Sequence, residues 1–178
     1  MVAISGMGAQ AACRAAQNLV AAGAKALLSF GLAGALDPQL QAGAVVLPHN
    51  VIDGAGGTYP AYGPWRDRLA AQAASMADAG QIVGGTLLSV ARPLSTVEAK
   101  SQARAQTGAC AVDMESFAIA EVAARMGVRF AVARVVIDSA TDELPLSVIR
   151  ATGRYGEVNL PRLVAGLAGA PADLPMLL

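Results

Sequence analysis

The chain has 178 residues, of which 54% are hydrophobic and 15% are charged, a composition that fits one α/β domain with a substantial core. Thirteen basic residues balance thirteen acidic ones, which argues against a nucleic-acid partner and against electrostatic attraction to an anionic membrane. The apolar runs are too broken to span a bilayer and the start of the chain lacks the basic region of a signal peptide, so we expect one domain over residues 1–178 without an integral membrane segment.

The first elements alternate between strand and helix patterns. Residues 1–5 predict a short strand, residues 6–8 a glycine turn, and residues 9–22 a helix that ends at a glycine. Residues 25–30 predict a second strand, and residues 31–38 a tight loop of small residues in which the backbone can come close to a ligand.

The glycine turn superficially matches a dinucleotide-binding fingerprint, because Gly6, Gly8 and Ala11 follow the G-x-G-x-x-A spacing between a strand and a helix. That fingerprint needs an acidic residue at the end of the next strand to hold the ribose hydroxyls, whereas this strand ends at Phe30 and Gly31. A nicotinamide-binding module is therefore an alternative, against a turn that serves packing or another ligand.

The middle of the chain continues the alternation. Four elements follow in order: a strand at 43–51, an irregular loop of the kind that forms lids at 53–64, a helix at 65–79 and a strand at 81–90. Ser95 and Glu98 have the spacing of a capping box that opens the next helix, so we interpret Glu98 as part of a cap rather than as a catalytic acid.

The stretch 111–138 carries the clearest signal. A short apolar strand runs into a helix that Gly127 ends, and residues 129–137 are β-branched and apolar almost throughout, as in a buried parallel strand. Glu115 and Asp138 lie just beyond the carboxyl ends of their strands, where open α/β sheets place ligands. An amphipathic helix is predicted near 158–167. The whole pattern predicts an α/β fold with a mostly parallel central sheet covered by helices.

The cysteines and the histidine give no sign of a metal centre. Cys13 and Cys110 are far apart and form no C-x-x-C pair, so we interpret them as buried, reduced thiols of a cytoplasmic protein rather than as a nucleophile or a redox pair. His49 is the only histidine, which excludes a histidine-rich zinc site and argues against a Ser-His-Asp triad. No metal is expected.

Three motifs at family spacing, which together reach across nearly the whole chain, resemble the nucleoside phosphorylase and nucleosidase superfamily of purine and uridine phosphorylases. They are SFGLAG at 29–34 followed by Asp37 and Pro38, VDME at 112–115, and Arg134-x-x-Ile137-Asp138-x-Ala140. The run 113–116, the turn at 138–140 that leads to Leu144 and Pro145, and the proline-rich end 171–178 most resemble the hopanoid-associated phosphorylases. That group is implied to remove adenine from adenosylhopane, and the next most similar relatives hydrolyse methylthioadenosine and S-adenosylhomocysteine.

The resemblance implies roles for two acids. Breaking an N-glycosidic bond builds positive charge on the ribose and negative charge on the departing purine. Asp138 is implied to protonate adenine at N7, which requires a raised pKa, and Glu115 is implied to accept hydrogen bonds from the ribose 2′ and 3′ hydroxyls. The structural alternatives are a turn cap for Asp138 and an acid in the first helical turn for Glu115.

Four further residues are implied to contact the substrate. Met114 would pack on the sugar or the base, with ordinary core packing as the alternative. Ala33 and Gly34 would lie beside the purine, and Met7 would form part of an apolar wall for the 5′ substituent.

The resemblance favours water over phosphate as the acceptor, because Ser29 stands where phosphate-using relatives carry an arginine. Phosphate stays open as a co-substrate if Arg92 or an arginine of a neighbouring subunit supplies the charge. No cofactor is expected. The family also begins with a strand and a water-activating glutamate, and this chain starts after them. Three explanations of this difference are open: a misassigned start codon, a fragment, or a protein that binds nucleoside without efficient turnover.

The sequence thus predicts an enzyme that releases adenine from a 5′-modified adenosine, with adenosylhopane as the expected substrate. A methylthioadenosine/S-adenosylhomocysteine nucleosidase, a purine nucleoside phosphorylase and a non-catalytic nucleoside-binding homologue are the alternatives. The apolar 5′ group implies transient contact with a membrane surface without an anchor, and a homo-oligomer is expected by family resemblance.

Overall fold

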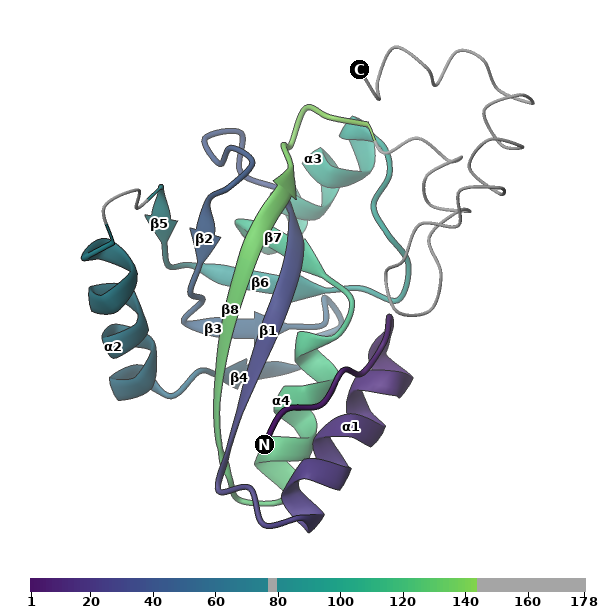
Figure 1. The fold of residues 1–178 in the computed structure, drawn as a ribbon. Helices are drawn as coiled ribbons and strands as arrows, with labels where there is room; N and C mark the ends of the chain where they lie inside the picture. The colour runs from purple at the N-terminus through teal and green to yellow at the C-terminus, as the bar shows by residue number, and fades with distance from the viewer. Residues whose placement is uncertain (77–79, 144–178) are drawn as a thin grey trace, which may run out of the picture.

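The computed structural model describes residues 1–76 and 80–143, which form one eight-stranded sheet and four helices (Figure 1). The helices are α1 Ala9–Ala21, α2 Gly63–Ala74, α3 Val97–Thr107 and α4 Ser116–Arg125. The strands are β1 Ala26–Ala35, β2 Val45–Val46, β3 Asn50–Ile52, β4 Thr58–Pro60, β5 Ile82–Val83, β6 Thr86–Ser89, β7 Ala111–Asp113 and β8 Arg129–Asp138. The helix predicted near 158–167 lies outside the described residues.

The sheet is mixed, with the strand order β4-β3-β6-β7-β1-β8-β2-β5. Four ladders are parallel (β1–β8, β2–β5, β3–β6 and β6–β7) and three are antiparallel (β1–β7, β2–β8 and β3–β4). The long parallel pair β1–β8 forms the spine of the sheet. The predicted α/β class with a sheet of mostly parallel ladders is therefore confirmed, and the carboxyl ends of β1 and β8 meet at one end of the molecule (Figure 1).

Local chemistry sets the helix ends. Gly8 has a φ of 90° and precedes α1, where a β-carbon would be strained. The side chain of Thr96, rather than the predicted Ser95, caps α3 by accepting a hydrogen bond from the backbone N of Ala99 at 3.2 Å. Gly108 then ends α3 in the left-handed conformation.

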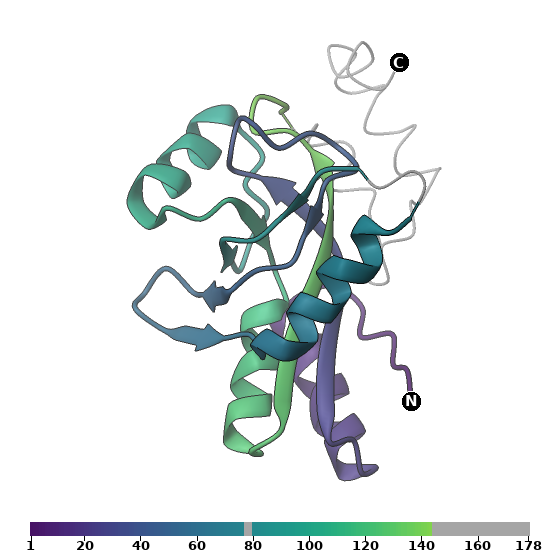
Figure 2. The same cartoon turned by 90° about the vertical axis from the view of Figure 1, so that its left-hand side faces the viewer.

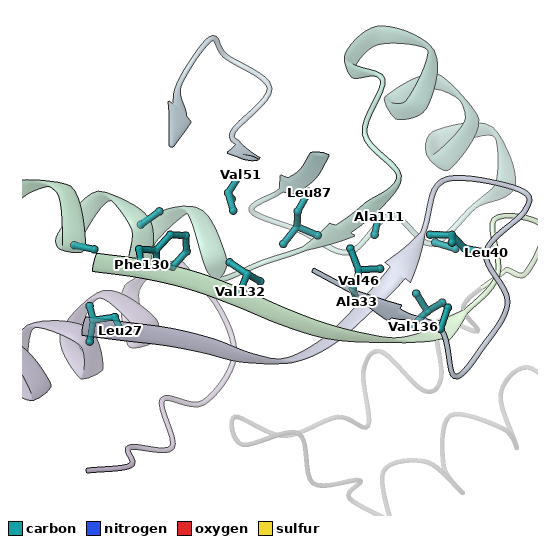
Figure 3. Packing of buried hydrophobic residues seen from close by; sticks show 14 of the residues in the cluster. Leu27, Ala33, Leu40, Val46, Val51, Leu87, Ala111, Phe130, Val132 and Val136 are labelled. Carbon is teal, nitrogen blue, oxygen red and sulfur yellow. The ribbon is translucent and has the colours of Figure 1, made fainter. Parts of the chain in front are cut away.

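One face of the sheet carries the core. Helices α1 and α4 lie side by side along the first halves of β1 and β8 (Figures 1 and 2), and α4 contacts both strands. Beneath it, the buried side chains of Leu27, Leu87, Phe130 and Val132 belong to one cluster (Figure 3). Each fully buried side chain of this kind contributes about 1.5–3 kcal/mol to folding.

The second face of β1 and β8 differs from the expectation that most elements are covered on both sides. Residues alternate along β1, so Leu27 and Ser29 are buried whereas Phe30 is 74% exposed and Leu32 is 57% exposed. Ile137 of β8 is 54% exposed. Within residues 1–76 and 80–143, these apolar side chains are left uncovered.

The predicted strand at residues 1–5 is wrong. These residues adopt no regular structure, and Met1, Val2 and Ile4 are strongly exposed. Their β-like composition is not sufficient, because a strand needs a partner whose backbone completes the ladder. The edge of β1 that faces away from β8 is paired with β7 only at Gly34 and Ala35.

The predicted loop at 31–38 is also partly wrong, since β1 continues through Ala35. Conversely, two predicted strands are each interrupted. Pro48, which has no N–H to donate, separates β2 from β3, and Gly85, with a φ of 106°, separates β5 from β6. The predicted lid-like loop at 53–64 contains β4, which forms a hairpin with β3.

Candidate active site

A cavity of about 1130 Å³ extends along β1, where residues 1–7 and α1 also line it, and reaches the carboxyl ends of β1, β7 and β8. All six residues that the sequence placed in a substrate site line this cavity: Met7, Ala33, Gly34, Met114, Glu115 and Asp138. Asp138 ends β8 and Glu115 lies two residues beyond the end of β7, and both line this one cavity, as a site with two carboxylates requires.

Asp138 is the last residue of β8 and is only 7% exposed. Burial raises the pKa of its carboxyl group, whereas the hydrogen bond and the charge of Lys100 lower it by less, and the charge of Asp142 adds to the rise. The carboxyl group therefore keeps a proton to a higher pH than an exposed aspartate does. The structure does not support a plain turn cap, because the Asp138 carboxylate bonds to Lys100 instead of to the following turn.

Lys100 of α3 is fully buried behind Asp138, and sequence reasoning missed it. Its Nζ donates to Asp138 Oδ2 at 2.5 Å, to the carbonyl O of Ser139 at 2.7 Å and to the carbonyl O of Asp142 at 2.8 Å. Lysine is rarely buried unless it is paired. No sequence signal marks this residue, because its helix has a mostly polar sequence in which the other positions are exposed or half-exposed.

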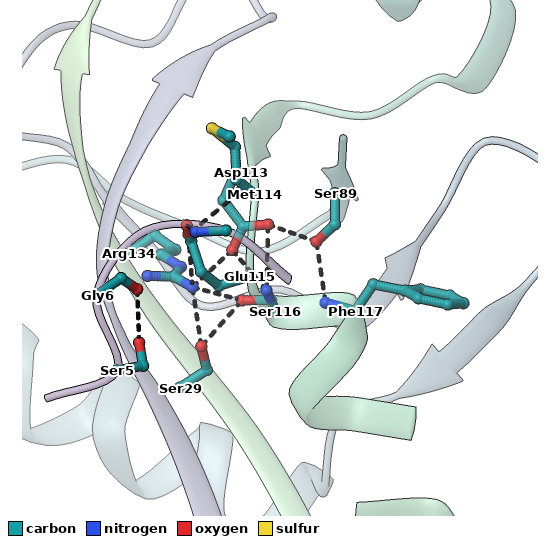
Figure 4. A network of polar contacts seen from close by, with 11 residues as sticks. Ser5, Gly6, Ser29, Ser89, Asp113, Met114, Glu115, Ser116, Phe117 and Arg134 are labelled. Carbon is teal, nitrogen blue, oxygen red and sulfur yellow. Dashed lines mark hydrogen bonds and ion pairs between the residues drawn. The ribbon is translucent and has the colours of Figure 1, made fainter. Parts of the chain in front are cut away.

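Glu115 directly precedes α4 and is fixed by backbone donors (Figure 4). Its Oε1 accepts from the N–H of Gly8 at 2.7 Å, and its Oε2 accepts from the N–H of Met114 at 3.3 Å. Glu115 thus bonds to the turn before α1 rather than capping α4. A pyrophosphate at that turn would meet the carboxylate of Glu115, which disfavours the nicotinamide-binding alternative.

Arg134 of β8 forms a buried polar cluster beside Glu115 (Figure 4). Its Nη2 donates to Ser29 Oγ and to Ser116 Oγ, both at 2.8 Å, and pairs with Asp113 Oδ2 at 2.7 Å. The nearest oxygen of Glu115 is 4.0 Å away. Nε of Arg134 has no partner in the described part of the chain. The resemblance included Arg134 and Asp113 in motifs without assigning either a role.

The remaining predicted positions differ in exposure. Ala33 is 4% exposed, whereas Met7 is 41% exposed at the open side of the cavity. Ser29, which the resemblance aligns with the phosphate-binding arginine of other members, accepts a hydrogen bond from Arg134. Arg92, the other proposed source of charge, is exposed and does not line the cavity.

The cysteines and His49 take no part in this cavity. Cys13 and Cys110 are half-buried and unbonded to each other, and burial raises the pKa of the Cys110 thiol. His49 is exposed and its Nδ1 accepts from the N–H of Gly85 at 3.0 Å. Among residues 1–76 and 80–143, no cluster of three potential metal ligands is found.

Comparison with known proteins gave a family match and several similar structures. The sequence matches the Phosphorylase superfamily over residues 1–167. The fold resembles a putative methylthioadenosine nucleosidase from Weissella paramesenteroides (22% identity, TM-score 0.72, covering 90% of this chain and 78% of that one). It also resembles the 5′-methylthioadenosine/S-adenosylhomocysteine nucleosidase of Neisseria meningitidis (22%, 0.72, 92% and 78%) and the S-adenosylhomocysteine nucleosidase of Streptococcus pyogenes (21%, 0.71, 94% and 78%). A search of the curated proteins found no match.

Proposed function

This chain belongs to the Phosphorylase superfamily, and from that premise we propose that it cleaves the N-glycosidic bond of a 5′-modified adenosine and releases adenine. One observation carries the proposal: Asp138, at the end of β8, and Glu115, two residues beyond the end of β7, line one cavity. As the bond breaks, positive charge develops on the ribose and negative charge on the purine, and each acid is proposed to stabilise one of these charges.

Asp138 is proposed as the general acid for the purine. Adenine leaves with negative charge unless a proton reaches its ring, and the family resemblance implies N7 as the position that receives this proton. The raised pKa of Asp138 favours the protonated form that this role needs. Gly34 lies directly against the carboxylate, so the absence of a β-carbon there lets the carboxyl group of Asp138 pack onto the end of β1 beside the cavity.

Glu115 is proposed to hold the ribose. Its carboxylate accepts two backbone hydrogen bonds, which fix its orientation before substrate binds. A fixed carboxylate that accepts hydrogen bonds from sugar hydroxyls stabilises the positive charge that grows on the ring, and the interaction strengthens toward the transition state. Arg134 positions this region by cross-linking β1, β7, β8 and the start of α4.

Water is the favoured acceptor. Phosphate needs cationic donors that are free to turn toward it. Arg134, the arginine that lines the cavity, is engaged by Ser29, Ser116 and Asp113. We therefore propose hydrolysis, and treat phosphate as a co-substrate to be tested.

The 5′ substituent is proposed to be apolar and large. The cavity is larger than the roughly 300–1,000 Å³ of common ligand pockets and extends toward the exposed apolar residues Met7, Phe30 and Ile137. Adenosylhopane is the finer proposal, and methylthioadenosine the alternative that the names of the similar structures support. A polycyclic tail loses about 0.8 kcal/mol per CH₂ on leaving an apolar phase, so a meeting at a membrane surface is part of this proposal.

No helix in the described residues has the length and apolarity to cross a membrane. A cytoplasmic location and a homo-oligomeric state remain proposals, and each is open to direct measurement by fractionation and by light scattering.

The test is an assay of free adenine. Purified protein is incubated with methylthioadenosine, S-adenosylhomocysteine, adenosine and detergent-dispersed adenosylhopane, each with and without phosphate. We expect phosphate-independent adenine release that is fastest with adenosylhopane. Equal rates for methylthioadenosine and adenosylhopane would remove the specific assignment. Adenine binding without product from any of them would instead identify a nucleoside-binding protein.

A further inference from the structure

The lysine behind Asp138 is buried, so it cannot be explained as an ordinary surface charge. Lys100 has 0% exposure, and it is the buried residue of α3, whose other positions are exposed or half-exposed. Bringing an ammonium group to such a place costs several kcal/mol unless good partners compensate. The partners of Lys100 therefore indicate what it does there.

Three acceptors surround Nζ of Lys100, and they differ in kind. Two are main-chain carbonyls, of Ser139 and Asp142, which can only accept. The third is the carboxylate oxygen of Asp138, which can either accept or, when protonated, donate. The hydrogen bonds of Lys100 can thus be satisfied in two ways.

In the first form, a charged Lys100 donates three hydrogen bonds and Asp138 is ionised. In the second form, a neutral Lys100 donates to the two carbonyls and accepts from a protonated Asp138. No donor or acceptor is lost between the two, and the heavy atoms need not move. In water the charged form wins by far, but removal of two charges from water favours the neutral pair, so burial brings the two forms closer in free energy.

A neighbouring negative charge shifts this balance toward a proton on Asp138, because it raises the pKa of that carboxyl group. Asp142 is the other charged residue that acts on Asp138, and its carboxylate is occupied by the N–H of Ser139 at 2.7 Å. Asp142 contacts Lys100 through its carbonyl oxygen rather than through its carboxylate. The proton therefore has two competing positions, one on Lys100 and one on Asp138.

We propose that Lys100 is the positioning residue and proton source that recharges Asp138, so that the proton given to the purine passes from Lys100 through Asp138. This inference rests on the function proposed above. In the charged form of the pair, Lys100 passes its proton to Asp138, and Asp138 passes a proton to N7 of the purine. The C1′–N9 bond breaks at the same time and its electron pair goes to the purine, so Lys100 is left neutral and Asp138 ionised. Water adds its oxygen to C1′, and the proton it releases restores the charge of Lys100 through solvent, so one water is consumed and no net proton is lost.

A purely structural role would give different behaviour. In that case Lys100 would only hold the turn at residues 139–142, and its removal would impair every substrate alike. A proton source matters only when the leaving group needs a proton. The discriminating substrate is 4-nitrophenyl β-D-ribofuranoside, because 4-nitrophenolate departs without protonation.

The experiment compares Lys100→Met with Asp138→Asn on both types of substrate. Lys100→Met keeps an unbranched side chain only one heavy atom shorter and removes the ammonium group that carries the proton. We expect adenine release by each variant to fall by about 10²-fold or more, while cleavage of the nitrophenyl riboside stays within about threefold of the wild type. Lys25→Met, a change at an exposed lysine outside the cavity, is the matched control and should leave both rates unchanged.

Equal losses on both substrates, or unchanged adenine release in Lys100→Met, would overturn the inference while the proposed function stands. A wild-type protein that releases no adenine from any nucleoside would overturn the proposed function and the inference with it.

If Lys100→Met alone fails to fold, the variant Lys100→Met/Asp138→Asn removes both members of the pair and leaves no unpaired buried charge. A lysine that acts only through Asp138 adds nothing once Asp138 is gone, so the double variant should match Asp138→Asn in adenine release. A further loss of tenfold or more would contradict the relay.

Discussion

Gly34 and Asp138 are direct partners across the β1–β8 ladder, because the register skips Ile137 between the Ala33–Val136 pair and the Gly34–Asp138 pair. Such an irregularity turns a side chain away from the position that a regular strand would give it, and it is common beside active sites. Here Ile137 faces outward and the Asp138 carboxylate lies over Gly34.

The first prediction concerns this pair. A β-carbon at position 34 would stand 3.0 Å from Oδ2 of Asp138, so Gly34→Ala must push the carboxylate aside. We expect kcat/KM for adenine release to fall at least tenfold, with a stability loss of about 1–3 kcal/mol from overpacking. Gly63→Ala is the control, because a β-carbon there meets nothing within 4 Å. Wild-type activity in Gly34→Ala would show that Asp138 is not placed as proposed.

The pH dependence of adenine release follows from the raised pKa of Asp138. The protonated acid is the active form, so kcat/KM should stay level at low pH and fall as the pH rises through the raised value. The stability contribution has the same sign: it is fully present below the ordinary aspartate pKa of about 3.9 and is lost as the pH rises through the folded-state pKa. Rate profiles and urea unfolding from pH 4 to 9 measure both. A profile that rises with pH over this range would contradict the acid role.

The β-α-β unit was the part of the fold that the sequence predicted best. Its helix carries apolar residues at helical spacing, its last strand is β-branched, and Gly127 separates them with a φ of 64°. These are local signals, and a local pattern specifies the element by itself. The six candidate site residues line one cavity, and most of them lie at or near the carboxyl ends of strands, which the topology of an α/β sheet brings together.

The errors have non-local causes. Residues 1–5 resemble a strand in composition, but their state depends on a neighbour across the sheet. Residues 31–35 resemble a turn, yet their small size serves the close approach of Arg134 and Asp138 to Gly31 and Gly34. Lys100 was missed because the burial of its side chain follows from the tertiary structure, and the local sequence carries no sign of that burial.

A third prediction tests the sugar contact. Glu115→Gln keeps the size of the side chain and removes the charge that is proposed to hold the ribose hydroxyls. The wild type should prefer a substrate with its 2′ hydroxyl over the 2′-deoxy analogue, and this preference in kcat/KM should shrink by at least tenfold in the variant. The intrinsic difference between the two substrates cancels in the comparison. An unchanged preference would place the 2′ hydroxyl away from Glu115.

A fourth prediction concerns the close packing of Gly31 on Arg134. A β-carbon at position 31 would lie 2.1 Å from Nη1 of Arg134, far inside contact distance. Gly31→Ala should therefore displace a buried guanidinium and destabilise the protein by about 2–4 kcal/mol, measured by urea unfolding. Gly63→Ala should change stability by less than about 1 kcal/mol. Equal stability of the two variants would mean that Arg134 does not lie against β1.

The final prediction separates the charge of Arg134 from its packing. Arg134→Met leaves the buried carboxylate of Asp113 without its ion-pair partner at 2.7 Å, and Asp113 is only 5% exposed. Removing one member of a buried pair costs about 3–5 kcal/mol, mostly because the other charge stays buried. Asp113→Asn added to Arg134→Met removes that charge and should recover at least 1 kcal/mol of the loss, although Ser89 and the N–H of Ser116 still bind position 113. Urea unfolding of the two single variants and the double variant gives the coupling energy between the residues. Strictly additive losses would show that the ion pair contributes nothing to linking β7 and β8 across the intervening β1.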